Sequence, residues 1–354
     1  MTQQVTEVKV CGAGLPDPSG TGVVWHYMAP RVLAIGVWTE RCEGRGEDAE
    51  PLFTHRMPDG EGILGVFDGL GGAGAGASCE LSDGTRRSGA WIGARLVRAG
   101  VEAWFRSQGP DPDPGGTPES LRGHLAELLS SVPAPPPSKI VSRMRKWLPT
   151  TMAVLRYRLD GEAAECRALW AGDSRVYALS RESGLQALTR DHTEETDCLR
   201  QLTQDPPMTN LICAGQEFVI DSHTLRLPLP CVLVCATDGF FGYVGTPAHF
   251  ECHLLSTLQE ARDEQEWAEL LARLVSSYTG DDASLSLAAL GFADFAQLRS
   301  GFIRRAREAE ARYRPADLPA EDLTASEWRL RAWDEYRPAY ERLMPPARPA
   351  KEPA

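Results

Sequence analysis

Alternating and continuous apolar runs divide most of the chain into short strand-like segments. The runs at 23–29 (VVWHYMA) and 32–38 (VLAIGVW) predict two strands, and a third run at 63–69 (ILGVFDG) stops at a glycine-rich loop. From residue 150 onward the same pattern predicts further strands, at 150–157, 164–172, 175–180, 223–228, 231–239 and 280–292.

Helical spacing of apolar residues appears in separate blocks. It predicts helices at 91–105, 121–132 and 264–278, and a helical patch at 194–202. Pro/Gly-rich stretches at 109–120 and 133–138 interrupt the pattern. Because the helices come in blocks and do not alternate one for one with the strands, the order favours an α+β layered sandwich over a doubly wound parallel sheet.

The C-terminal part has a different character. Residues 293–354 contain two charged, aromatic-marked helical stretches, at 302–313 and 325–343. We therefore divide the chain into a leader with the first strand (1–29), a main domain (30–292) and a helical C-terminal extension (293–354). Four aromatic residues of the extension recur near helical spacing and are predicted to dock it on the main domain: Trp328, Trp333, Tyr336 and Tyr340.

Composition narrows the function classes. Among 354 residues, 37 Lys and Arg stand against 49 Asp and Glu, so the formal charge is −12 and a nonspecific nucleic-acid binder is not expected. The hydrophobic fraction of 42% and the charged fraction of 24% are typical of a soluble globular protein. No apolar run approaches the length of a membrane span, and the first residues lack the order of a signal peptide. We expect a cytoplasmic protein with no nucleic-acid or membrane partner.

The nine cysteines do not form a disulfide framework, since their count is odd and their spacing irregular. Cys231 and Cys235 share one face of the predicted strand 231–239, so we interpret them as buried core thiols. No CxxC pair or His cluster has zinc-ligand spacing, and a structural zinc site is not expected.

The chemistry is indicated by acidic residues at strand ends or in tight turns. A carboxylate at the mouth of a buried strand loses hydration unless something compensates it, although a single Asp-Gly there is usually only a turn. Several such acids, with few basic residues beside them, suit hard divalent cations such as Mg²⁺ or Mn²⁺. The acids are Asp48, Asp68, Asp173, Asp238, Asp281 and Asp282.

An ordered series of motifs over residues 30–292 resembles the metal-dependent protein phosphatases, the type-2C serine/threonine phosphatase family, in its bacterial form. In chain order these are an ED pair, GVFDGLGG, a TT pair opening a strand, GDSRVY, LTRDH, TDG and GDDAS. The resemblance implies a four-layer α-β-β-α sandwich of two mainly antiparallel sheets flanked by helices. It also implies a phosphoprotein substrate carrying phosphoserine or phosphothreonine, and a kinase as a further partner.

The resemblance further implies two Mn²⁺ or Mg²⁺ ions, which generate a hydroxide that attacks phosphorus in line. Asp68 would bridge the two ions, Glu47 would act through a bound water, and Asp173 matches the acid that helps hold a third, looser ion in bacterial members. Asp281 falls on the family's ligand and Asp282 on its usual following Asn. The implied metal donors are Glu47, Asp48, Asp68, the Gly69 carbonyl, Asp173, Asp238 and Asp281, with Asp68 and Asp238 central to catalysis.

The sequence departs from the family at two positions. Glu43 stands where the family has a phosphate-binding Arg, so Arg45 is our candidate clamp, with Arg41 as the other candidate. Leu70 replaces the His of some members and leaves the general acid unassigned. We interpret His192 of the TRDH motif as a structural hydrogen-bonding residue.

Two rival functions stay open. Gly69, Gly71 and Gly74 spell GxGxxG after a strand, which is the pattern of a nucleotide-binding enzyme if a helix follows directly. The other rival is a catalytically weak binding or regulatory module with a phosphatase fold, which the C-terminal extension keeps open.

Overall fold

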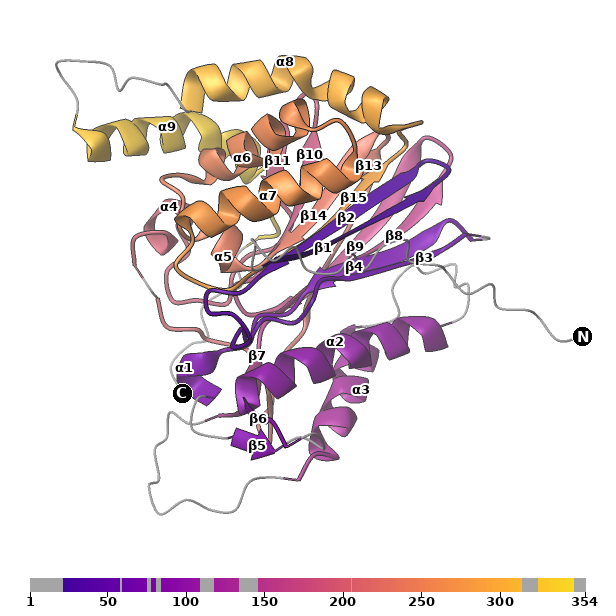
Figure 1. The fold of residues 1–354 in the computed structure, drawn as a ribbon, viewed down its shortest axis with the longest axis vertical. Coiled ribbons are helices and arrows are strands. Elements are labelled where there is room, and N and C mark those ends of the chain that lie inside the picture. The colour runs from indigo at the N-terminus through magenta and orange to yellow at the C-terminus, as the bar shows by residue number, and fades with distance from the viewer. Residues whose placement is uncertain are drawn as a thin grey trace, which may run out of the picture.

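The computed structural model describes residues 22–57, 59–74, 78–80, 84–108, 118–133, 146–204, 206–313 and 324–346. Most of the leader, the Pro/Gly-rich stretches at 109–117 and 134–138, and the turn between the two C-terminal helical stretches lie outside the described residues. Two antiparallel sheets stack face to face at the centre, with helices outside both (Figure 1).

The first sheet has six strands and carries both N-terminal strands. Their order across the sheet is β1 (Gly22–Ala29), β2 (Val32–Thr39), β15 (Ala283–Leu290), β14 (Cys231–Ala236), β10 (Arg175–Ser180) and β11 (Gly184–Ala187). Every neighbouring pair is antiparallel, and the register sets Val32 against Leu290 and Leu33 against Ala289.

The second sheet has five strands, again all antiparallel. Their order is β13 (Asp221–Pro228), β9 (Ala163–Ala171), β8 (Met152–Asp160), β4 (Glu61–Val66) and β3 (Leu52–Arg56). Two small ladders lie beside it, one joining β12 (Ile212–Ala214) to β7 (Trp147–Thr150) and the other joining β5 (Ser78–Glu80) to β6 (Arg86–Ser88).

Helices cover the outer face of each sheet (Figure 1). The second sheet is covered by α2 (Gly89–Ser107) and α3 (Pro118–Ser130), and the first by α6 (Pro247–Glu260), α7 (Glu264–Tyr278), α8 (Phe295–Tyr313) and α9 (Ala325–Tyr340). Three helices of one turn lie in connections: α1 (Gly71–Gly74), α4 (Cys198–Gln201) and α5 (Asp238–Phe241).

Three separate apolar layers fill this arrangement, because successive residues of a strand point to opposite faces. On β14, Val232 and Val234 face the helices, while Cys231, Leu233 and Cys235 face the other sheet. A strand that is buried on both faces needs apolar residues at nearly every position. This explains the continuous apolar runs in the sequence. The α-β-β-α prediction is confirmed, and Cys231 and Cys235 are buried free thiols, as expected.

The sequence pattern missed several elements, among them strands β3 and β11 of the two main sheets and helix α6. Helix α6 begins with Thr246 and Pro247, a start signal that is readable in the sequence: the Thr246 backbone N–H donates to His249 Nδ1 at 3.2 Å. Its buried positions are nearly continuous and include Glu251 and Thr257, since it packs against α8 and α9 as well as on the sheet, so the one-sided helical pattern is weak.

Helix α9 is anchored through a fully buried carboxylate. Glu251 of α6 accepts hydrogen bonds from the Tyr336 hydroxyl at 2.6 Å, the Leu185 backbone N–H at 2.9 Å and Arg305 Nη2 of α8 at 3.0 Å. Tyr336 and Tyr340 are each 1% exposed. The aromatic residues therefore dock the C-terminal helix, as their spacing predicts, with Trp328 only partly buried against the same core.

No helix among the described residues is both long enough and apolar enough to span a bilayer.

Trp333 of α9 is 2% exposed, whereas Leu330 of the same helix is 56% exposed. We expect Trp333→Ala to lower the free energy of unfolding by about 3 to 5 kcal/mol, because a large buried ring leaves a cavity. Leu330→Ala should change it by less than about 0.5 kcal/mol. Urea unfolding followed by circular dichroism measures both free energies. Equal losses of stability in the two variants would contradict the conclusion that α9 packs into the core.

Candidate active site

The predicted acids meet at one end of the central sandwich, and the strand order explains why. Strands β4 and β9 both run antiparallel to β8, so their carboxyl ends, followed by Asp68 and Asp173, reach the same edge. In the other sheet, β14 runs antiparallel to β15, so Asp238 after β14 lies beside Asp281 before β15. Asp48 precedes β3 and is 2% exposed.

Electrostatics confirm that these carboxyl groups are close together. Burial, followed by the charges of Asp48, Asp238, Asp173 and Asp281, raises the pKa of Asp68 well above its ordinary value. Burial and the charges of Asp173, Asp281 and Asp48 do the same for the pKa of Asp238. Among the ion pairs of the described residues, none joins a Lys or Arg to Asp48, Asp68 or Asp238.

Asp48 shows the balance of forces at one carboxylate. Burial, and after it the charge of Asp282, raises its pKa to about 7, although a hydrogen bond from Thr237 Oγ1 at 2.9 Å acts in the opposite direction. Thr237 Oγ1 also accepts from the Ser284 backbone N–H at 2.9 Å, so Asp48 is tied to the ends of β14 and β15.

A pair of threonines holds the Asp68 turn. The Asp68 backbone carbonyl accepts from Thr150 Oγ1 at 2.7 Å and from the Thr151 backbone N–H at 2.9 Å. Thr151 Oγ1 lies 2.6 Å from Ser174 Oγ, next to Asp173. Leu148, two residues before the pair, is fully buried at φ 55°, a left-handed conformation that packing must impose on a residue other than glycine. The two threonines therefore connect the Asp68 turn to the turn that carries Asp173.

Asp282 has a role that sequence reasoning missed. Its two carboxylate oxygens accept backbone N–H groups of Arg41 at 2.8 Å and Glu47 at 2.7 Å. Together with Glu40, which accepts from Gly46 at 2.9 Å, it folds the loop that carries Glu47 and Asp48. Asp281 as a whole is exposed, but neighbouring groups partly desolvate its carboxyl group, and this raises its pKa. The only hint of this positioning role in the sequence is that Asp282 falls where the phosphatase family that the chain resembles usually has Asn.

The glycine-rich loop makes room for Glu47. A Cβ on Gly69 would lie 2.4 Å from the Glu47 carbonyl oxygen, and one on Gly71 would lie 1.7 Å from Glu47 Oε2. Glu47 is also bonded by the Ser88 hydroxyl, and its pKa is raised, mainly by burial. Because α1 is one turn long and every strand pair in the described part of the chain is antiparallel, these glycines lie outside the parallel βαβ context of a dinucleotide site.

The donor chemistry fits a hard divalent cation, since the site gathers carboxylate oxygens that repel one another. Among the described residues, however, no group of three or more His, Cys, Asp or Glu side chains is arranged closely enough to hold a metal ion. The assignment of Glu47, Asp48, Asp68, Gly69, Asp173, Asp238 and Asp281 as metal donors therefore stays a prediction.

Solved structures share this architecture. A bacterial serine phosphatase matches with a TM-score of 0.50 and 16% identity, over 73% of this chain and 97% of that chain. The chain has the fold of a bacterial serine phosphatase. The family resemblance is thereby confirmed at the level of the fold.

Two further structures of the phosphatase PstP give lower TM-scores. PstP/Ppp of Mycobacterium tuberculosis matches with a TM-score of 0.48 and 17% identity, over 74% of this chain and 99% of that chain. A PstP catalytic domain in complex with 2 manganese ions matches with a TM-score of 0.47 and 15% identity, over the same shares. No protein-family model matches the chain, and no curated protein matches it.

In this phosphatase fold, His192 makes the hydrogen bonds of a structural residue. Its Nδ1 accepts from the Gly172 backbone N–H at 3.1 Å, and its Nε2 lies 2.9 Å from Asp221 Oδ2. It is 8% exposed. It therefore holds the turn before Asp173 in place, as the sequence interpretation expects.

The arginines at the mouth of the site differ in their contacts. The side chain of Arg45 is exposed and makes no hydrogen bond or ion pair within the described part of the chain, and Arg41 is exposed beside Asp281. Arg87, which sequence reasoning missed, donates to the Gly44 carbonyl and lies 4.9 Å over the Trp91 ring. Its position next to the N-cap Ser88 of α2 was the only available signal.

The raised pKa of Asp48 predicts a pH dependence for the metal-free protein. Because the folded pKa of about 7 exceeds the ordinary 3.8, this carboxyl contributes stability that is fully present below pH 3.8 and is lost as the pH rises through 7. We expect Asp48→Asn to reduce the fall of the melting temperature between pH 4 and 8 in chelator. Parallel melting curves for wild type and Asp48→Asn across this range would contradict the assignment.

Proposed function

We propose that the chain is a metal-dependent phosphomonoester hydrolase, and specifically a serine/threonine protein phosphatase. The observation that carries the proposal is the convergence of Asp48, Asp68, Asp173, Asp238 and Asp281 at one end of a bacterial serine phosphatase fold. Of these residues Asp48 is buried, Asp68, Asp173 and Asp238 are half-buried, and Asp281 is exposed. Such a concentration of negative charge is stabilised by divalent cations, and phosphate ester hydrolysis is the chemistry that paired divalent cations assist.

Two Mn²⁺ or Mg²⁺ ions, with a third that Asp173 would help to hold, would supply a hydroxide at neutral pH and neutralise the phosphate oxygens. Asp48, Asp68, the Gly69 carbonyl, Asp238 and Asp281 would hold the two ions, with Glu47 acting through a water. Thr150 and Thr151 keep the Asp68 turn in place, and Asp282 keeps the Glu47 loop in place. Positioning and electrostatics are thus what the chain itself contributes.

A phosphoprotein is the substrate we propose, with a kinase as the enzyme that must supply it. The site lies at the rim of the sandwich, where the exposed arginines Arg41 and Arg45 and the half-buried Arg87 can meet an anionic group. A guanidinium donates two parallel hydrogen bonds to a phosphate, which makes arginine the suitable residue here.

A phosphatase-fold binding module is the second candidate function. The observation that keeps it open is the C-terminal extension, whose helices α8 and α9 pack on the phosphatase-like sandwich. The two candidates differ in turnover: the module would bind phosphopeptide without releasing phosphate.

The proposed chemistry predicts that phosphate release from a phosphothreonine peptide and from an aryl phosphate depends on metal. Activity should vanish in excess chelator and return with Mn²⁺ or Mg²⁺. Full activity after exhaustive chelation would exclude the two-metal mechanism, and peptide binding without any release would favour the binding module.

Asp68→Ala and Asp238→Ala should each lower kcat by several orders of magnitude, because each loses a donor to the ions. Asp334→Ala, at an exposed position of α9, is the matched control and should leave kcat unchanged. Steady-state kinetics with saturating Mn²⁺ measures the effect, with circular dichroism to check folding. Wild-type turnover in Asp238→Ala would refute its assignment.

The phosphate clamp is tested by Arg45→Ala, with Arg41→Ala and Arg87→Ala compared under the same conditions. If Arg45 binds ground state and transition state alike, its loss should raise KM about tenfold and leave kcat nearly unchanged. A defect confined to Arg41→Ala or to Arg87→Ala would move the clamp to that residue.

A further inference from the structure

The further inference concerns the C-terminal helix and rests on the proposed function. The starting point is Arg175, which follows Asp173 at the beginning of β10 and is 2% exposed. Its guanidinium forms an ion pair with the Asp191 carboxylate, with Nε 3.0 Å from Oδ1 and Nη2 2.7 Å from Oδ2. The side chains of Arg175 and Asp191 are 3% and 5% exposed, and arginine keeps its charge in proteins. The pair is therefore a charged, desolvated clamp.

The clamp holds the segment 188–192 against the turn that carries Asp173. The Leu188 backbone N–H donates to the Val176 carbonyl at 2.8 Å, and the His192 backbone N–H donates to the Gly172 carbonyl at 3.0 Å. Segment 188–192 thus brackets the turn on both sides. The position of Asp173 consequently depends on where Arg175 holds Asp191.

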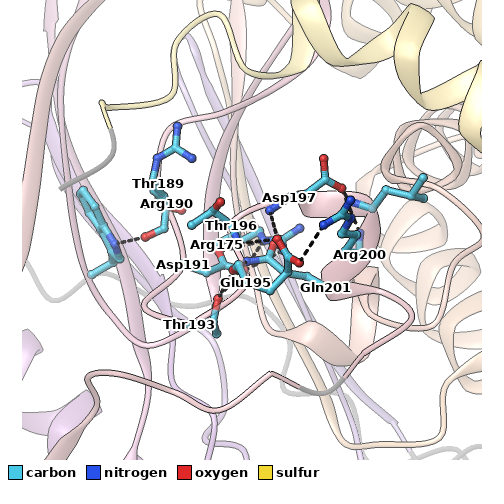
Figure 2. A network of polar contacts seen from close by, with 12 residues as sticks. Arg175, Thr189, Arg190, Asp191, Thr193, Glu195, Thr196, Asp197, Arg200 and Gln201 are labelled. Carbon is cyan, nitrogen blue, oxygen red and sulfur yellow. Dashed lines mark hydrogen bonds and ion pairs between the residues drawn. The ribbon is translucent and has the colours of Figure 1, made fainter. Parts of the chain in front are cut away.

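Helix α9 supplies a further hydrogen-bond partner of Arg175, the Tyr340 hydroxyl. The guanidinium Nη1 donates to the Tyr340 hydroxyl at 3.3 Å, in a buried contact between residues 165 positions apart in the sequence. Arg175 also lies 4.2 Å over the Phe241 ring, and Nη2 donates to Gln201 of α4 at 2.7 Å. Figure 2 shows Arg175 and Asp191 together, with the α4 residue Gln201 beside them.

A second set of contacts joins α9 to α4. Arg337 Nη1 donates to Asp197 Oδ2 at 2.9 Å, and the other Asp197 oxygen caps α4 by accepting the backbone N–H groups of Leu199 and Arg200. Gln201 in turn donates to Thr193 Oγ1 at 2.9 Å. Helix α9, α4 and the segment after Asp191 therefore form one closed network.

We propose that α9 positions the Asp173 side of the site, with the Tyr340 hydroxyl as a positioning residue that acts through Arg175 and Asp191. The helix contributes no group to the reacting atoms. It holds the Arg175–Asp191 ion pair in place, and this ion pair holds the turn that carries Asp173. Ser174 of that turn contacts Thr151, whose backbone N–H binds the Asp68 carbonyl. The C-terminal extension is thus a structural part of the catalytic unit.

Tyr340→Phe tests this, because it keeps the ring packed against Trp333 and Tyr177 and removes only the hydroxyl. The matched control is Tyr336→Phe, one turn earlier on α9, whose hydroxyl bonds Glu251 and not Arg175. The readouts are melting temperature, the Mn²⁺ concentration for half-maximal turnover, and hydrogen exchange of amides in 172–176 and 188–201.

Tyr340→Phe should raise the half-maximal Mn²⁺ concentration about fivefold, the factor expected for one hydrogen bond, and should speed exchange in both segments. Tyr336→Phe should lower the melting temperature but leave the Mn²⁺ response and these exchange rates as in wild type. Unchanged exchange in Tyr340→Phe, or equal changes in both variants, would overturn the proposal. If wild type releases no phosphate with any metal, the proposed function fails, and the exchange comparison still decides the positioning role.

Discussion

The repulsion among buried and half-buried carboxylates at one end of the sandwich is the constraint on which the rest of the structure depends. Asp48, Asp68 and Asp238 each lose hydration, and each feels the charges of the others, so their pKa values are raised. A fold assembles such a group only if packing elsewhere outweighs the cost. Here three apolar layers lie behind the acids and supply that stabilisation.

Backbone hydrogen bonds to the acidic turns keep the repelling groups from moving apart. Thr150 and Thr151 bind the Asp68 carbonyl, Thr237 joins Asp48 to β15, and Asp282 gathers two backbone N–H groups of the Glu47 loop. Such preorganisation would serve the phosphate hydrolysis that we propose, because groups that are already in place need no rearrangement as charge develops.

The C-terminal helix α9 contributes both to the apolar packing and to the contacts that hold the acidic turns. Its aromatic rings join the apolar layer that contains residues of α6 and α8, and its Tyr336 hydroxyl helps satisfy the buried Glu251 carboxylate. Through Tyr340 it also reaches Arg175, the cation that neutralises Asp191 beside the acidic site. Stability of the extension and geometry of the site are therefore linked through one helix.

The sequence by itself determined what depends on local spacing. Period-two and helical patterns located most strands and helices, placed Cys231 and Cys235 on one strand face, and marked the docking face of α9 by Trp333, Tyr336 and Tyr340. It also placed each acid at a strand end or in a tight turn. Helix α6 and strand β3 escaped because burial on several sides or a short length weakens the one-sided pattern.

Only the tertiary structure decided which of these groups meet. Antiparallel pairing of β4 and β9 with β8, and of β14 with β15, brings Asp68, Asp173, Asp238 and Asp281 to one edge. The role of Asp282, the place of Arg87 and the contact of Tyr340 with Arg175 also depend on residues far apart in the chain. Strand order and helix docking are set by the summed packing of the whole core, so no local spacing encodes them.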